Sequence, residues 1–513
     1  MNFEHQQNNS LTRSAFGFNA YFVILCLWQL FALALPAAAQ TFTNLHSFTG
    51  SDGANPWCSL ILSGHTLYGT TSTGGSSTNG TVFAINTDGS SFTNLHNFTP
   101  VVQVYEGSFP IPPGSILYPV YAYTNTDGAN PTANLISSGN TLYGTASAGG
   151  NFGNGTIFAI HTDGTGFTNL YNFTAFNPAN AKINSDGAGP QAGLILSGNT
   201  LYGTTSAGGN FGNGTVFAIH TDGMGFSNLH SFTKGGFYPP IGSTNSDGAS
   251  PVAGLILSGD TLYGTASAGG MGGGTVFAVK TNGLGFMNLH SFIGGNEGSD
   301  PRAGLILSGY TLYGTTRNSG SGGNGTVFAV NTDGLGFTNL YSFTAAYSIN
   351  FLPNTDGANP LGTLILLGDT LYGTTSWDGN PGVGTVFAIN TNGTGLTIPY
   401  RFTGNGGTGW EPVDGLLLSG NTLYGTTLNG GASGNGTVFG LSLPLPQLTI
   451  TPSGTNVLLT WPTNFSGFNL QFTTNLIPPE IWNSVQPNPA LVNGLNTVTN
   501  PISVSQKFYR LKQ

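Results

Sequence analysis

The tetrapeptide Leu-Tyr-Gly-Thr occurs seven times in this chain, and no other feature constrains the fold as strongly. Each copy is followed, after a turn rich in Gly and Asn, by a variant of Gly-Thr-Val-Phe-Ala. Self-similarity at a period of tens of residues is typical of repeat folds, in which every unit is one supersecondary element. The seven copies begin at Leu67, Leu142, Leu201, Leu262, Leu312, Leu371 and Leu423.

One repeat unit can be followed from residue 185 to residue 232. The turn Gly198-Asn199 has Gly first, as a two-residue type II′ hairpin turn requires. Short apolar segments separated by turns rich in Gly, Asn and Asp are typical of strands. The unit therefore predicts a four-stranded antiparallel sheet. Its predicted strands are 192–197, 200–206, 214–219 and 226–232.

Seven such units in succession predict an all-β fold, a seven-bladed β-propeller of four-stranded blades, over residues 41–442. A β-helix would need shorter and more uniform coils. The longest connection follows the fourth strand, which is therefore expected to be the outer strand. The chain after residue 40 begins with an outer strand, 41–48, and the repeats end with a third strand, 436–441. We predict that the N-terminal strand pairs with the last blade and closes the ring, which removes exposed sheet edges.

Both ends of the chain differ from the repeats. Residues 21–35 form an apolar run followed by Pro-Ala-Ala-Ala, so residues 1–39 are predicted to be a signal peptide, with a retained N-terminal anchor as the alternative. Residues 443–446 have the composition of a linker. Residues 447–513 predict five or six strands with one or two core tryptophans, a small fibronectin- or immunoglobulin-like β-sandwich.

The composition limits which classes of partner and which cellular compartment can be expected. The net charge is −9 and only 6% of the residues are charged, so a nucleic-acid partner is not expected. After signal cleavage no other segment is apolar and long enough to span a bilayer. Cys58 would then be the one cysteine left, which excludes an intrachain disulfide. We expect a monomer that is secreted or held at the cell surface.

A set of acidic residues obeys the repeat. Each stands 15 residues before Leu-Tyr-Gly-Thr and is followed by Gly. Turn chemistry explains this pattern, because Asp caps its own backbone and Gly adopts positive φ. The alternative is a ring of acids around the mouth of the central channel that binds cations. The set is Asp52, Asp127, Asp186, Asp247, Glu297 and Asp356, with Thr408 in the seventh repeat.

No catalytic constellation can be identified. Most acids follow the repeat, whereas an active site would break it. Four acids that lie outside the repeated sets would favour an enzyme if they cluster: Glu106, Asp378, Glu411 and Asp414. Histidines exchange with Tyr at one repeat position, which indicates packing and not metal binding. We predict no catalytic residue, no metal site and no cofactor.

Functional residues are expected at the positions that depart from the repeat. Four insertions follow the predicted outer strands, at 99–126, 174–185, 233–246 and 344–355, so all should emerge on one face. Exposed aromatic side chains on variable loops over a rigid scaffold are typical of binding surfaces. The alternative is that they pack locally over the blades. The candidate binding residues are Tyr105, Tyr121, Tyr238, Trp377 and Trp410.

The order and spacing of Leu-Tyr-Gly-Thr, Gly-Thr-Val-Phe-Ala, Thr-Asp-Gly and Asn-Leu-His-Ser-Phe resemble the GloVer tandem repeat of bacterial exported proteins, a choice-of-anchor family. The resemblance covers about residues 41–442 and implies an extracellular protein with a sorting or anchoring tail. It implies no biochemical activity. The chain departs from the family pattern because it ends in the predicted sandwich and not in a Pro-Glu-Pro tag, apolar helix or basic tail.

These observations favour an exported, non-enzymatic repeat protein that presents loops to a partner. A glycan or another surface protein is the expected kind of partner, and its identity is open. Two alternatives remain: a polysaccharide-active enzyme on a propeller scaffold, and a purely structural protein of the envelope.

Overall fold

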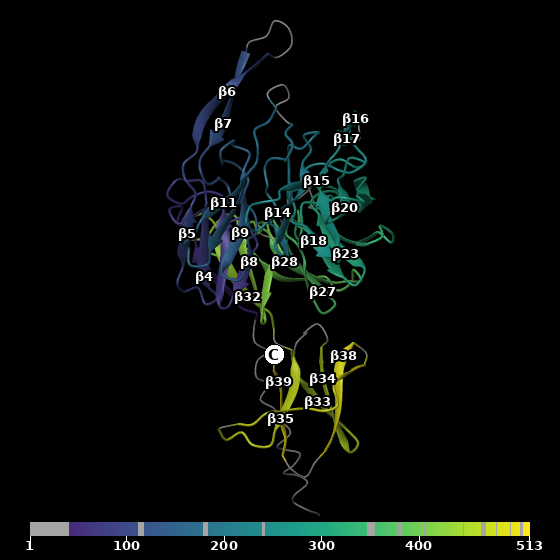
Figure 1. The fold of residues 1–513 in the computed structure, drawn as a ribbon. Coiled ribbons are helices and arrows are strands. Elements are labelled where there is room, and N and C mark those ends of the chain that lie inside the picture. Colours follow the sequence, from purple (N-terminus) through teal and green to yellow (C-terminus); the bar gives the residue numbers. More distant parts are fainter. Residues whose placement is uncertain are drawn as a thin grey trace, which may run out of the picture. The chain divides into compact units, whose positions relative to one another are not determined.

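The computed structural model describes residues 40–512 apart from 111–116, 178–182, 239–241, 346–353, 378, 380–381, 405–406, 445, 463–467, 479, 493 and 503–505. The predicted signal peptide, 1–39, lies outside the described residues. The described part of the chain is all-β, as predicted, and its one helical element is the 3-10 turn η1 (Gly295–Glu297) (Figure 1). No helix in the described residues is long and apolar enough to cross a membrane.

The repeat unit forms a four-stranded antiparallel sheet, as its turns predict. Its strands are β12 (Ile195–Ser197), β13 (Thr200–Thr205), β14 (Thr215–His220) and β15 (Ser227–Ser231), in that order. The first strand is shorter than predicted, because residues 192–194 do not join the ladder. Residues 191–194 and their equivalents lie between a proline that recurs in every repeat and the first strand, and we call them the lead-in segments.

The described chain from residue 42 to residue 442 forms seven sheets of this kind, numbered 1 to 7 in the order of their first strands. Sheet 3 is given above. The others are sheet 1, β2 (Ile61–Ser63), β3 (Thr66–Thr71), β4 (Thr81–Asn86) and β5 (Thr93–Asn97); sheet 2, β8 (Ile136–Ser138), β9 (Thr141–Ala146), β10 (Thr156–His161) and β11 (Thr168–Asn172); sheet 4, β18 (Ile256–Ser258), β19 (Thr261–Ala266), β20 (Thr275–Lys280) and β21 (Met287–Ser291); sheet 5, β22 (Ile306–Ser308), β23 (Thr311–Thr316), β24 (Thr326–Asn331) and β25 (Thr338–Ser342); sheet 6, β26 (Ile365–Leu367), β27 (Thr370–Thr375), β28 (Thr385–Asn390) and β29 (Thr397–Arg401); and sheet 7, β30 (Leu417–Ser419), β31 (Thr422–Thr427), β32 (Thr437–Ser442) and β1 (Phe42–Ser47).

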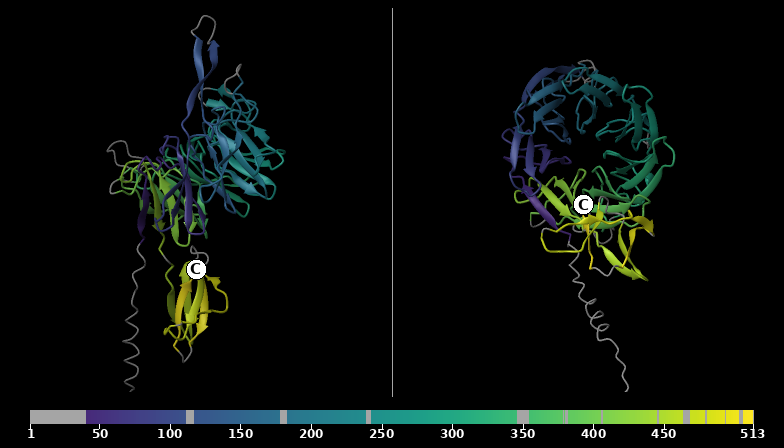
Figure 2. Two further views of the ribbon diagram at one scale, coloured as in Figure 1. Left: turned by 60° about the vertical axis from the view of Figure 1, so that its left-hand side comes forward. Right: turned by 60° about the horizontal axis from the view of Figure 1, so that its bottom comes forward.

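Sheet 7 is built from both ends of this region. Strand β1 pairs antiparallel with β32, from Phe42 opposite Leu441 to Ser47 opposite Thr437. Figure 2 shows the sheets arranged around a common centre, with the start and the end of the repeats side by side. A hydrophobic cluster lies between each pair of neighbouring sheets, including sheets 7 and 1.

The repeated tetrapeptide makes the same contacts in each sheet, and Leu201 to Thr204 illustrate them. Leu201 is fully buried, and Tyr202 packs in the cluster shared with sheet 4. Gly203 faces the ring of Phe217 on the next strand, and a Cβ there would lie 2.6 Å from Phe217 Cζ. The hydroxyl of Thr204 donates to the carbonyl of Ala253 in the lead-in segment of sheet 4. Each residue type is therefore required by packing or by contact with the next sheet.

Threonine hydroxyls of the second strands connect successive sheets in the same way. The exception is Thr315 of sheet 5, whose hydroxyl has no partner in the described structure. The donors and the accepting carbonyls are Thr70 to Ala133, Thr145 to Ala192, Thr204 to Ala253, Thr265 to Ala303, Thr374 to Asp414 and Thr426 to Cys58.

A second contact between sheets involves the residue before each conserved proline. This residue has a φ between 52° and 64° in all seven repeats, and its N–H donates to a carbonyl of the preceding sheet region. The left-handed conformation favours Gly and Asn, and Glu is strained there. The residues are Asn55, Asn130, Gly189, Ser250, Asp300, Asn359 and Glu411. Asp300 and Glu411 therefore occupy a repeat position, and the prediction that Glu411 lies outside the repeat was wrong.

Two of the predicted insertions contain hairpins. Strands β6 (Val102–Pro110) and β7 (Leu117–Thr124) form one two-stranded sheet, and β16 (Gly236–Tyr238) and β17 (Gly242–Thr244) form another. Figure 1 shows both hairpins on the same side of the ring of sheets. The insertions at 174–185 and 344–355 lie partly outside the described residues.

The C-terminal residues form two further sheets with their own core. One contains β33 (Thr449–Ser453), β34 (Asn456–Pro462), β38 (Leu495–Pro501) and β37 (Ala490–Val492), and the other contains β36 (Asn483–Ser484), β35 (Asn469–Thr473) and β39 (Phe508–Lys512). Trp461 of the first sheet and Leu470 of the second lie in one hydrophobic cluster. Trp482, predicted as a second core candidate, instead lies under the guanidinium of Arg510 at 4.0 Å.

The close packing around the glycine before the third strand can be tested with two glycines of sheet 3 that both have positive φ. Gly214→Ala would place a Cβ 2.2 Å from the carbonyl oxygen of Thr205 and 2.7 Å from the ring of Pro251, whereas Gly198→Ala meets nothing within 4 Å. We expect Gly198→Ala to cost about 1–2 kcal/mol. Gly214→Ala should cost at least about 2 kcal/mol more, because the overlap adds to the backbone strain. Thermal and urea unfolding measure both, and equal losses would contradict the packing argument.

Candidate functional site

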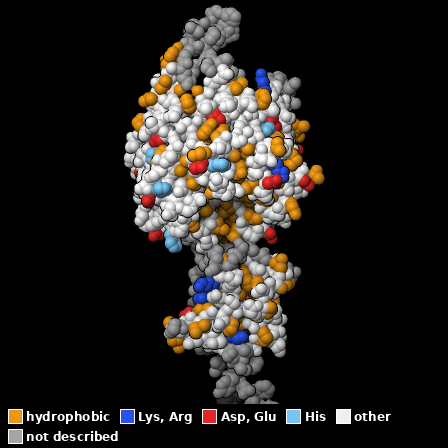
Figure 3. Space-filling model, in the orientation of Figure 1, with side chains coloured by type: hydrophobic (Ala, Val, Ile, Leu, Met, Phe, Trp, Pro, Cys, Tyr) orange, Lys and Arg blue, Asp and Glu red, His pale blue; other side chains and the backbone are white. Residues whose placement is uncertain are grey.

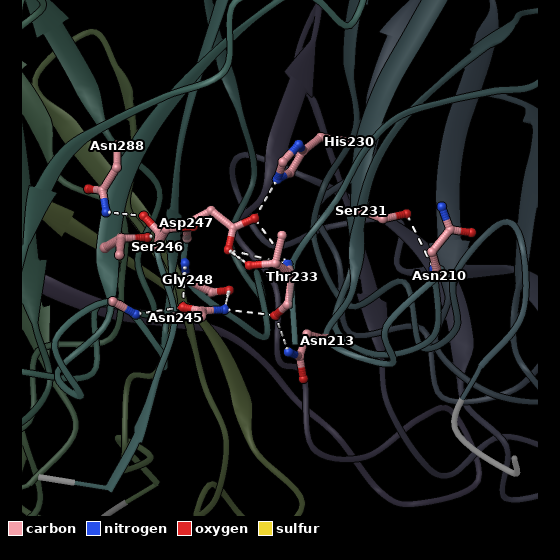
Figure 4. Close-up of polar contacts among 12 residues, drawn as sticks. Asn210, Asn213, His230, Ser231, Thr233, Asn245, Ser246, Asp247, Gly248 and Asn288 are labelled. Atoms are coloured by element: carbon pink, nitrogen blue, oxygen red, sulfur yellow. Dashed lines mark hydrogen bonds and ion pairs between the residues drawn. The ribbon is translucent and has the colours of Figure 1, made fainter. Parts of the chain in front are cut away.

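The repeated acids are hydrogen-bond acceptors at the connections between sheets. In the best-described example, Asp247 accepts from the backbone N–H and hydroxyl of Thr233, and its Oδ2 lies 2.9 Å from Nε2 of His230 (Figure 4). His230 lies in the fourth strand of sheet 3 and Thr233 follows that strand, while Asp247 precedes sheet 4. The carboxylate therefore joins one sheet to the chain that begins the next.

The adjacent Asn245 completes this connection. Its side-chain oxygen accepts from the N–H groups of Gly248 and Gly270, and its amide donates to the carbonyls of Thr233 and Gly248 (Figure 4). Asn125, Asn184 and Asn354 make the same kind of contacts in their repeats. Sequence analysis recognised the Asp-Gly turn but missed this asparagine, although its place two residues before Asp in four repeats is a detectable signal.

Histidine and tyrosine are equivalent donors to these acids. His46 lies 3.1 Å from Asp52 and His96 lies 2.9 Å from Asp127. The hydroxyls of Tyr171 and Tyr341 replace the imidazole and donate to Asp186 at 2.8 Å and to Asp356 at 2.6 Å. His290 lies 3.3 Å from Glu297. The exchange of His for Tyr is explained, because both place a donor at the carboxylate and an aromatic ring over the next sheet.

Burial and hydrogen bonds act in opposite directions on these acids. Burial alone raises the pKa of Asp127 and Asp247, but hydrogen bonds from His96, His230 and the two threonines outweigh it and lower the pKa of both carboxyls. Burial lowers the pKa of His46 and His290, and the neighbouring carboxylates only partly offset it.

The structure does not bring the six acids together. Five of them accept hydrogen bonds within their own connections, and Glu297 makes an ion-pair contact with His290. None of the six lines the central cavity as the structure describes it. Among the described residues, no group of three or more His, Cys, Asp or Glu side chains could hold a metal ion. The contacts therefore give these carboxylates a structural role as acceptors that hold consecutive sheets together.

The candidate binding residues are distributed over several loops. Tyr105 and Tyr121 face each other across the β6–β7 hairpin, with ring centroids 5.8 Å apart and exposed fractions of 57% and 43%. Trp377 is exposed, while Trp410 is partly buried and bridges Asn429. Tyr238 lies in β16, and its side chain lies outside the described residues. The two hairpin tyrosines are thus the one described pair of candidate side chains in mutual contact.

Of the four acids whose clustering would favour an enzyme, the structure describes the side chains of two. Asp378 and the side chain of Glu106 lie outside the described residues. Glu411 accepts from the amide of Asn429, whereas Asp414 accepts from the backbone N–H groups of Ser59 and Gly415. Glu411 and Asp414 therefore have separate partners and do not form a carboxylate pair with each other.

A cavity of about 520 Å³ lies at the centre of the sheets and is lined by the lead-in segments of all seven. Isoleucines from the first strands, such as Ile61 and Ile195, form part of its apolar wall. Figure 3 shows hydrophobic side chains gathered in a hollow at the lower side of the ring of sheets. One sequence candidate, Asp414 of the four acids outside the repeated sets, lines this cavity.

The fold defines this chain as an all-β protein of tandem four-stranded sheets. Residues 109–244, 240–351 and 345–457 match the Gloeobacter/Verrucomicrobia repeat, and the chain belongs to this repeat family. The match confirms the tandem-repeat resemblance seen in the sequence. No curated protein sequence matches the chain.

Solved structures resemble the chain only weakly. An oligogalacturonate lyase in complex with manganese is 10% identical with a TM-score of 0.43, and the match covers 80% of this chain and 94% of that one. A candidate 6-phosphogluconolactonase from Bacteroides fragilis is 15% identical with a TM-score of 0.41, covering 87% of this chain and 98% of that one. At these values the likeness carries no argument about function.

The exchange of His for Tyr predicts the effect of substitutions at residue 230. His230→Tyr should keep a donor to Asp247 and change the free energy of unfolding by less than about 1 kcal/mol, because Tyr171 and Tyr341 make this contact in other repeats. His230→Phe keeps the ring but removes the donor, and should cost about 1–3 kcal/mol. Urea unfolding compares the two variants. Equal stabilities of both would show that the hydrogen bond contributes nothing.

Asp414 predicts a pH dependence opposite to that of the repeated acids. Burial raises its pKa to about 6, so its contribution to stability is present below the ordinary carboxyl pKa and is lost as the pH rises through 6. Asp414→Asn should therefore gain stability relative to wild type between pH 4 and 6, by on the order of 2–3 kcal/mol. Unfolding curves across this window measure the difference. Asp88→Asn is the matched control, because hydrogen bonds from Ser90 lower the pKa of this exposed carboxyl.

Proposed function

We propose that this protein is an exported, non-enzymatic binding scaffold: a closed seven-bladed β-propeller that presents its insertions to a partner at the cell surface. The partner is a glycan or another surface protein. The C-terminal residues, as a fibronectin- or immunoglobulin-like sandwich, serve as an attachment or sorting module. The protein is secreted or held at the surface and acts as a monomer.

Contacts between sheets 7 and 1 support a closed ring. The N–H of Asn55 donates to the carbonyl of Asn435 at 2.9 Å, and the hydroxyl of Thr426 donates to the carbonyl of Cys58 at 2.9 Å. These two hydrogen bonds have the same partners in the repeat as those between the other sheets. A ring closed in this way has no exposed sheet edge and gives its loops a rigid base.

One observation carries the binding role: the β6–β7 hairpin departs from the repeat and exposes aromatic side chains. Tyr105 and Tyr121 stand edge to face on it, and Val102, Val104 and Tyr123 are also exposed. Tyrosines supply large, rigid contact area with a polar tip, which suits both sugar rings and protein surfaces. The repeats need no such hairpin, because sheets 4 and 5 are connected without one.

The double variant Tyr105→Ala/Tyr121→Ala tests the binding role. We expect its binding to a glycan array and to purified envelope polysaccharide and surface protein of the producing bacterium to weaken at least tenfold. Tyr310→Ala is the matched control, because Tyr310 is 84% exposed but belongs to a tight hairpin turn of sheet 5. Binding of neither class of partner by the wild-type protein would favour the purely structural alternative. Release of reducing ends from a bound polysaccharide would favour the enzyme.

A further inference from the structure

The positions that line the central cavity hold different residue types in different repeats. Every lead-in segment contributes lining residues, and in sheet 1 these are alternate residues, as in an extended chain whose successive side chains point in opposite directions. In sheet 1 these are Trp57 and Ser59, followed by Ile61 of the first strand. The position nearest the proline holds six residue types in seven repeats. It is occupied by Trp57, Thr132, Gln191, Val252, Arg302, Leu361 and Val413.

Polar side chains converge on one side of the cavity. The backbone N–H of Ser59 lies 2.8 Å from Asn134 Oδ1 of sheet 2 and 2.8 Å from Asp414 Oδ2 of sheet 7. Across the cavity the positions equivalent to Ser59 are Gly193, Gly254 and Gly304. The polar lining side chains over sheets 7, 1 and 2 include Asp414, Ser59 and Asn134, and those over sheets 3 to 5 are Gln191 and Arg302.

Asp414 is not required by the scaffold. The equivalent residues in the other six repeats are small, and one of them, Cys58, fills its place as a buried thiol. A carboxylate withdrawn from water without a cationic partner costs stability, although Asp414 accepts hydrogen bonds from Ser59 and from the backbone N–H of Gly415. The six small equivalents are Cys58, Ala133, Ala192, Ala253, Ala303 and Gly362.

The lining matches a neutral ligand with hydroxyl groups on its edges and an apolar face. Arg302 and Asp414 are the charged residues that line the cavity, one of each sign, and Arg302 Nε already donates to Asp300 at 2.8 Å. Trp57 is 40% exposed and offers an indole face. Amide, carboxylate and hydroxyl groups can bond sugar hydroxyls. A volume of about 520 Å³ is in the range of small-ligand sites.

We propose that the central cavity binds a neutral saccharide of one to three units, with Trp57 as the stacking platform and Asp414, Asn134 and Gln191 as hydrogen-bonding groups. This site is separate from the insertion face, and its assignment rests on the proposed role of the protein as a binding scaffold. Saccharide recognition there needs no movement of the sheets, because the lining residues belong to the rigid lead-in segments.

The test is titration calorimetry of the full-length protein, produced in a bacterial host, with a panel of neutral mono-, di- and trisaccharides. Tryptophan fluorescence provides a second readout, in which the difference between wild type and Trp57→Ala isolates Trp57 from the other tryptophans. We expect at least one sugar to bind, and Trp57→Ala and Asp414→Ala each to weaken its binding at least tenfold. Asp414→Ala should remain folded, because Ala occupies this position in sheets 2 to 5. Its thermal midpoint, compared with that of wild type, verifies this.

Two controls separate this site from the insertion face. Trp377→Ala removes an exposed indole that does not line the described cavity, and Tyr105→Ala/Tyr121→Ala alters the hairpin; both should leave saccharide affinity within twofold. The inference is overturned if no neutral sugar binds, if neither cavity substitution changes the saccharide affinity, or if only a uronate or Ca²⁺ binds. In each of those cases, loss of partner binding in the hairpin variant would still support the proposed function.

Discussion

The structure depends on the close approach of each conserved proline to a glycine at the start of the third strand of the preceding sheet. A Cβ on Gly80 would lie 2.7 Å from the ring of Pro131, and a Cβ on Gly436 would lie 2.5 Å from Pro56. Two further contacts between sheets accompany this one. The residue before the proline lies in the left-handed region, and its N–H donates to a carbonyl of the preceding sheet. The lead-in carbonyl then lies within reach of a threonine hydroxyl.

Because each interface between sheets has several such contacts, single residues can vary without loss of the ring. The donor to the repeated acid is His at 230 and Tyr at 171, and in sheet 7 the acid itself is replaced by Thr408. These exchanges preserve a hydrogen bond and a stacked ring, so they carry no information about a ligand. The cavity and the β6–β7 hairpin are different, because at these places the repeats differ from one another in side-chain size, polarity and charge together.

The sequence predicted the sheets well because their strands and turns are local. Gly198-Asn199 and the alternation of turns and apolar segments define each hairpin within a few residues, and repetition multiplies that signal. Contacts between sheets join residues up to 63 positions apart, or, as for Asn55 and Asn435, opposite ends of the repeats. Local patterns do not reveal such pairs. Glu411 was therefore interpreted as a non-repeat acid, although its neighbour Pro412 marks it as the left-handed residue of sheet 7.

The same reasoning explains why the cavity was not predicted. Trp57 and Asp414 are 357 positions apart, and no spacing rule connects them. Because the sheets surround a common centre, these residues line one cavity with Asn134 and Gln191. The residues by which single repeats differ from the others therefore form one asymmetric wall. Asymmetry is the informative property, because the other six repeats have Cys, Ala or Gly at the position of Asp414. A carboxylate there costs stability at neutral pH, so its presence is better explained by something it contacts in the cavity than by the scaffold.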